Sequence, residues 1–135
     1  MLRGLSEDRR EAAGKRLGRA VAVHRDSATR LALLVQYRAE YRSRLAAGAA
    51  RGVTPGELRN FREFLDKLEQ AIAQQRAELE TLARGVEECR GHWLAEHRRE
   101  KSYGVLAERT ESGEREREAR RAQKQTDEFS SRKRA

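Results

Sequence analysis

Apolar residues return at steps of three and four along the second half of the chain, and this spacing limits the fold most strongly. Twelve of the sixteen positions visited in this way between Leu58 and Thr110 are apolar. The alternation averages about 3.5 residues per turn, which keeps one narrow strip of a helix against a partner helix in a left-handed coiled coil. The pattern therefore predicts a long helix that packs lengthwise on another helix.

A broader apolar stripe between Leu17 and Leu45 predicts a second long helix in the first half of the chain. This helix is expected to begin near Ser6, because acidic residues favour a helix N-terminus and Glu7 and Asp8 follow at once. The two stripes together form the predicted coiled-coil seam, which comprises Leu17, Leu31, Leu58, Phe61, Leu65, Ile72, Leu79, Leu82, Val86, Cys89 and Trp93.

The only proline of the 135 residues, Pro55, marks the start of the second helix. Thr54 is the predicted N-cap, with Glu57 reaching back to it three residues later. Gly48 and Gly52 are candidate stops for the first helix. The predicted elements are a helix over about 6–48, a turn over about 49–54 and a helix over about 55–129.

These elements predict an all-α protein: two long antiparallel helices in a single coiled-coil hairpin over 1–135, with the second helix extending beyond the first. Equal rise along both helices and a turn near Gly52 make facing residue numbers add to about 103, so Ile72 should face Leu31. The charged segment 111–135 lacks a seam, and an all-polar helix of this kind is only marginally stable alone.

Amino-acid composition limits which classes of function the protein can have. Charged residues make up 39% of the chain and aromatic residues 5%, which suits an elongated helical protein better than a thick globular core. The net charge of +8 belongs mostly to residues 1–50, and a basic surface attracts nucleic acid, anionic lipid or acidic proteins alike. A single cysteine and the lack of a long apolar run lead us to expect a cytoplasmic protein.

No residue pattern indicates catalysis, a metal, a cofactor or a small-molecule ligand. His92 and His97 are five apart, which is not the spacing of a helical zinc pair, and His24 lies on an apolar stripe where a packing role is expected. Cys89 lies in the seam, where it is expected to act as a small apolar residue. We therefore expect a protein that is not an enzyme.

Large apolar residues near the turn exceed what a minimal seam needs. Phe64 flanks the seam on the second helix and Tyr37 is similarly displaced on the first, with Leu34 and Tyr41 nearby. Two interpretations stay open: ordinary packing beside the seam, or a surface that binds a partner.

Four stretches, in order and spacing, resemble the flagellar FliJ family. They are "LLVQYRAEYRSRL", "LRNFREFLDKLEQAIAQQRAEL", "WLAEHRREKSYGVLAER" and "REARRAQKQTDEF", and the likeness extends from about Leu17 to Phe129. The resemblance implies an antiparallel two-helix coiled coil that is similar to the coiled-coil part of the rotary ATP synthase γ subunit.

By the same resemblance, the protein would be a cytoplasmic part of the flagellar type III export apparatus, associated with the inner membrane only peripherally. Its implied partners are the hexameric ring of the FliI ATPase, which it would stimulate, the export gate FlhA and the export chaperones. The implied ATPase contact lies at the end that holds both termini. The implied gate contact carries over onto Leu34, Tyr37, Tyr41, Phe64, Leu68, Ala71 and Gln75.

Two alternatives remain, a basic coiled coil that binds nucleic acid and a plain structural spacer. Nucleic acid is not an expected partner, because the aromatic residues are not interleaved with a lysine-rich stripe and residues 51–110 have no net charge. A spacer would need the seam but not the extra aromatic residues.

Overall fold

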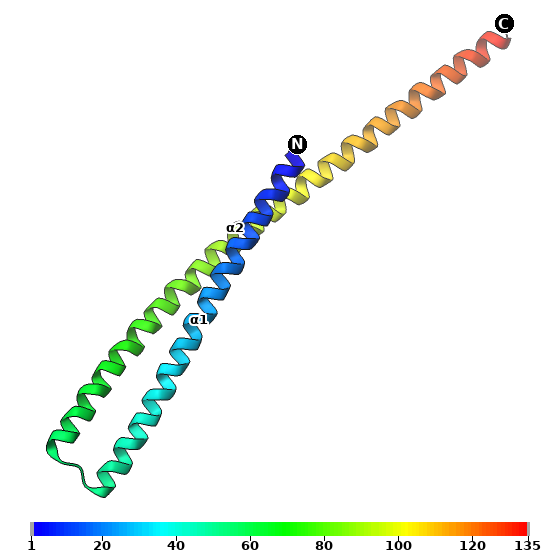
Figure 1. Cartoon of the computed structure of the whole chain (residues 1–135). Coiled ribbons are helices and arrows are strands. Elements are labelled where there is room, and N and C mark those ends of the chain that lie inside the picture. The colour runs from blue at the N-terminus through cyan, green and yellow to red at the C-terminus, as the bar shows by residue number, and fades with distance from the viewer. Residues whose placement is uncertain (1, 135) are drawn as a thin grey trace. The chain divides into compact units, whose positions relative to one another are not determined.

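The computed structural model describes residues 2–134 and consists of two long helices joined by a short turn (Figure 1). Helix α1 spans Leu2–Arg51 and helix α2 spans Pro55–Arg134. Between residues 2 and 134 there is no strand, and the helices on either side of the turn run side by side in opposite directions (Figure 1). The predicted all-α helical hairpin is confirmed.

The turn is built as the sequence indicates, with one difference. Thr54 caps α2, since its Oγ1 accepts a hydrogen bond of 3.2 Å from the backbone N–H of Glu57. Gly52 ends α1 in the left-handed region, with φ of 90°, and its N–H donates to the carbonyl of Ala49 at 3.3 Å. Gly48, the other candidate stop, is wrong as a stop because it lies inside α1.

Both helices are longer than predicted. Helix α1 begins at Leu2 and not near residue 6, and Ser6 lies inside the helix with only 3% of its surface exposed. The helix also continues to Arg51 and not to residue 48, since Gly52 is the glycine with the backbone of a helix stop. Helix α2 runs to Arg134 and not to residue 129, and its side chains from 114 to 132 are exposed.

The residues group into two compact units, which we describe separately. The hairpin unit comprises Ala13–His92, and the end unit comprises the described residues up to Ala12 together with those from Trp93 onward. The prediction of one domain over 1–135 stays a prediction.

The core of the hairpin unit is a thin line of apolar side chains along the helix contact. Leu68, Ile72 and Val86 of α2 and Ala13 of α1 are between 1% and 8% exposed. Ser27 of α1 touches Gln75 of α2, so facing residue numbers add to about 102, close to the predicted register. Every predicted seam residue in this unit is buried or half-buried. Across residues 2–134, neither helix has a stretch long and apolar enough to cross a membrane.

Candidate partner-binding surfaces

Four aromatic rings cluster near the turn end of the hairpin unit. Tyr41 packs on Phe64 and on Phe61, with ring centroids 4.5 and 5.2 Å apart. Tyr37 meets Phe64 edge to face at 6.0 Å, an arrangement that aromatic rings favour. We call these four residues the aromatic cluster.

The cluster has a covered side and an open side. Tyr41 and Phe61 are half-buried between the helices, whereas 42% of Tyr37 and 36% of Phe64 remain exposed. The two outer rings therefore keep much of their apolar surface in water. Exposed aromatic surface that is held rigidly by neighbours is typical of protein contact sites.

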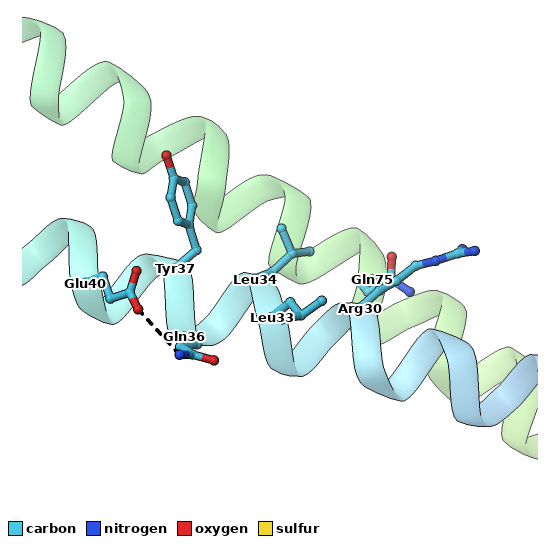
Figure 2. A pocket seen from close by; sticks show the side chains of 7 residues that line it. All are labelled: Arg30, Leu33, Leu34, Gln36, Tyr37, Glu40 and Gln75. Atoms are coloured by element: carbon cyan, nitrogen blue, oxygen red, sulfur yellow. Dashed lines mark hydrogen bonds between the residues drawn. The ribbon is translucent and has the colours of Figure 1, made fainter.

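A shallow groove of about 630 Å³ adjoins Tyr37 on α1 (Figure 2). It is lined by Arg30, Leu33, Leu34, Gln36, Tyr37, Glu40 and Gln75. Leu34 and Tyr37 are directed toward α2, and Gln36 donates a hydrogen bond to Glu40 at 3.4 Å (Figure 2). Leu33, which is 60% exposed, was missed by sequence reasoning because it is one residue off the seam.

Ion pairs fix the helices beside the cluster. The Glu69 carboxylate accepts hydrogen bonds from Arg38 at 2.9 Å and from Arg42 at 2.7 Å. Arg38 is the polar residue that interrupts the stripe of the first helix, and its side chain is only 17% exposed. The interruption in the sequence therefore marks a cross-helix ion pair, which the register alone did not reveal because it places residue 65, and not Glu69, opposite Arg38.

A polar contact lies inside the hairpin unit where the seam contains Gln75. The side-chain N–H group of Gln75 donates to the Ser27 hydroxyl at 2.7 Å and approaches its carbonyl at 3.3 Å. Ser27 is 2% exposed, so the contact is buried on the side of α1. Sequence reasoning missed Ser27, although the register places it opposite Gln75.

The seven residues expected at the gate contact do not all lie at the surface. Tyr37 and Phe64 are exposed, and Leu34, Tyr41, Ala71 and Gln75 are half-buried. Leu68 differs, because it is 6% exposed and belongs to the core.

The end unit has a different interior. Ser6 is 3% exposed and Glu96 is 6% exposed, and neither Ser6 Oγ nor Glu96 Oε2 has a hydrogen-bond partner within the described residues. The other oxygen of Glu96 accepts from Arg99 at 3.5 Å, and Arg10 forms an ion pair with Glu100. The polar positions that break the seam after Trp93 are therefore occupied by acids turned toward α1.

Of the residues considered for chemistry, Cys89 and His92 line one small cavity of about 200 Å³ with Ala13, Arg16 and Glu88. In the part of the chain that the structure describes, no group of three or more His, Cys, Asp and Glu residues could hold a metal ion. His92 is exposed, His24 is half-buried, and His97 stacks on Trp93 with ring centroids 5.2 Å apart. Cys89 is a half-buried free thiol.

The fold therefore defines the protein as an antiparallel coiled-coil hairpin, whose distinctive surface is a packed and partly exposed aromatic cluster. Residues 1–135 match the family model described as "Flagellar FliJ protein". The chain is also 30% identical over 131 residues to the flagellar FliJ protein of Escherichia coli K12, covering 97% of this chain and 89% of that relative. The flagellar FliJ protein of Salmonella typhi is 28% identical to this chain over 131 residues, which cover 97% of this chain and 89% of that relative.

The chain belongs to the FliJ family, as its sequence stretches indicated. Family membership assigns it to flagellum biogenesis and to protein export by the flagellar apparatus.

Proposed function

We propose that the protein is a non-catalytic adaptor of flagellar export that links the FliI ATPase ring to the FlhA export gate and escorts export chaperones. It works in the cytoplasm and reaches the inner membrane only through the export apparatus. Membership of the FliJ family supports this role over nucleic-acid binding or simple spacing. The mechanism is coupling: the hairpin biases the arrangement of the subunits that hydrolyse ATP while another part engages the gate.

The observation that carries the proposal is the exposed pair Tyr37 and Phe64 on a rigid aromatic base. The gate contact would use these two rings together with the half-buried neighbours Leu34, Tyr41, Ala71 and Gln75. Core residue Leu68 would act by holding the surface in shape. A rigid aromatic surface loses little side-chain entropy on binding, which favours a tight contact.

The ATPase contact would lie elsewhere, on the basic first helix and the charged tail over 111–135. Side chains over residues 114–132 are exposed and carry alternating charges, so they are available to a partner. A helix of this composition gains order when it is bound.

The test is a double substitution, Tyr37→Ala with Phe64→Ala, assayed against purified FlhA and purified FliI. We expect FlhA binding to weaken by about tenfold or more, because truncating a central aromatic residue typically costs over 1 kcal/mol. Helicity and FliI binding should be retained. Val23→Ala is the matched control, since Val23 is 51% exposed on the same unit but lies outside the cluster.

A second variant, truncated after Glu111, should do the opposite and weaken FliI binding alone. If the aromatic variant loses FliI and the truncation loses FlhA, the two contacts are reversed. If neither variant changes either affinity, the aromatic cluster is only packing and the proposed contacts are wrong.

A further inference from the structure

Helix α2 carries a second apolar strip within the end unit, beside the face that packs on α1. At one edge the strip adjoins α1, since Lys101 and Val105 also line a groove with Arg3, Glu7 and Arg10. The residues that line the shallow groove there are Arg98, Lys101, Ser102, Val105, Leu106 and Arg109, around a space of about 460 Å³. Val105 is 40% exposed and Leu106 is 52% exposed, and Leu94, about three turns earlier, is 38% exposed. We call residues 94–109 of this face the outer strip.

The outer strip is distinct from the seam. Successive residues of an α-helix are rotated by about 100° around its axis. By this rotation, the side chains of the outer strip lie around one side of α2, whereas Trp93, Glu96 and Tyr103 lie around nearly the opposite side. Those three residues are half-buried or buried, while every residue of the outer strip is exposed. A helix with apolar residues on two faces has more apolar surface than one partner helix can cover.

Charge separates this surface from an ordinary solvated face. Within the described residues, Arg98, Lys101 and Arg109 form no ion pair, whereas Arg99 on the neighbouring face pairs with Glu96. The strip contains no acidic residue of its own, although Lys101 and Val105 also line a groove with Glu7, Glu100 and Glu108. Three cations without an ion pair thus adjoin the exposed aliphatic side chains.

We propose that the outer strip is a docking site for an amphipathic helix of a partner protein that has an apolar stripe flanked by acidic residues. The steps from Leu94 to Arg98, Lys101 and Val105 are four, three and four, the spacing by which one helix packs along another. The strip covers about four turns, roughly 22 Å, which matches a partner helix of about 15 residues. Its narrow width and aliphatic character suit a helix better than a bilayer surface.

The test uses a designed helical peptide with leucines at alternating spacings of three and four and glutamates on both flanks. Binding to the full-length protein is measured by fluorescence anisotropy. Arg98→Glu, Lys101→Glu and Arg109→Glu together should weaken it by about tenfold or more, since each charge is adjacent to the bound acids. Val105→Ser with Leu106→Ser should weaken it as well, without loss of helicity.

The matched control carries the same change in charge in the exposed tail: Arg120→Glu, Arg121→Glu and Lys124→Glu. It should alter the affinity by less than about twofold, because the sequence from 111 to 128 contains no leucine, isoleucine or valine. A lysine version of the peptide should bind the outer-strip reversal variant better than the natural chain.

Three results would overturn the proposal. The two charge-reversal variants could lose the peptide equally, which would indicate unspecific attraction. A scrambled acidic peptide without an apolar stripe could bind as tightly. Vesicles of anionic phospholipid could bind in a strip-dependent way while the peptide does not, which would make the surface a lipid site. None of these results depends on the proposed contact at the aromatic cluster, so the two proposals fail separately.

Discussion

The hairpin unit and the end unit both place polar side chains inside a helix contact, but only the hairpin unit pairs them fully. Ser27, 2% exposed, accepts a hydrogen bond from Gln75 at 2.7 Å. In the end unit, Ser6 Oγ and Glu96 Oε2 are buried and have no partner among residues 2–134. A buried polar group without a partner costs about 1–3 kcal/mol, so the two contacts should differ in stability although the same two helices form them.

The hairpin unit also buries more large apolar side chains than the end unit does. The hairpin unit contains the buried side chains Leu68, Ile72 and Val86, whereas Leu2 and Leu5 of the end unit are 66% and 49% exposed. Apolar burial is the main source of helix–helix stability. The comparison shows that a continuous helix can have a well-packed and a weakly packed partner contact along its length.

The largest expected effect comes from breaking the core of the hairpin unit. Leu68→Asp places a charge against apolar neighbours and should lower the free energy of unfolding by about 3 kcal/mol or more. Leu33→Asp is the control, because Leu33 is 60% exposed on the partner helix. Thermal melts followed by circular dichroism measure both, and equal melting temperatures would contradict the assignment of Leu68 to the core.

A smaller loss should follow from removing one member of the buried polar pair. Gln75→Ala leaves the Ser27 hydroxyl buried without this partner and should cost about 1–3 kcal/mol. Adding Ser27→Ala to that variant should restore part of the loss, because both polar groups are then gone. A double-mutant cycle from chemical denaturation measures the coupling, and additive effects would show that the pair contributes nothing.

The smallest effect is expected in the end unit, where the substitutions should raise the stability and not lower it. Ser6→Ala with Glu96→Leu removes both unpartnered atoms and should stabilise the contact of residues 2–12 by about 1 kcal/mol. Native-state hydrogen exchange should show slower exchange over these residues and unchanged exchange over the hairpin core. Faster exchange over residues 2–12 would mean that the two polar side chains stabilise the end unit.

The positions at which prediction succeeded and failed have physical reasons. Thr54 was identified as the cap because capping depends on neighbours within three residues. Gly48 and Gly52 were not distinguished, because either can end a helix and only the path of the chain decided that Gly52 takes φ of 90°. The helix was expected to begin near Ser6 because two acidic residues follow it, but Ser6 lies inside α1, where it is buried.

Among the residues of the candidate surfaces, prediction likewise succeeded for some and failed for others. Tyr37 and Phe64 could be picked out because they are aromatic and displaced from the seam, and they are indeed exposed. Leu68 was grouped with them by the resemblance to the FliJ family, although it is 6% exposed, because a contact carried over from a family does not separate surface residues from the core residues beneath them. Ser27 was overlooked because a serine gives no apolar signal, and its burial depends on a residue 48 positions away.

By itself, the sequence determined the two helices, the turn between them and the approximate register, because apolar periodicity, capping and helical rise act over a few residues. The tertiary structure decided which polar side chains share a partner: Gln75 with Ser27, and Glu69 with both Arg38 and Arg42. It also decided that Val105 and Leu106 remain 40% and 52% exposed. These outcomes require the side-chain positions of two helices at once, since a hydrogen bond or an exposed surface is a property of the pair and not of either helix alone.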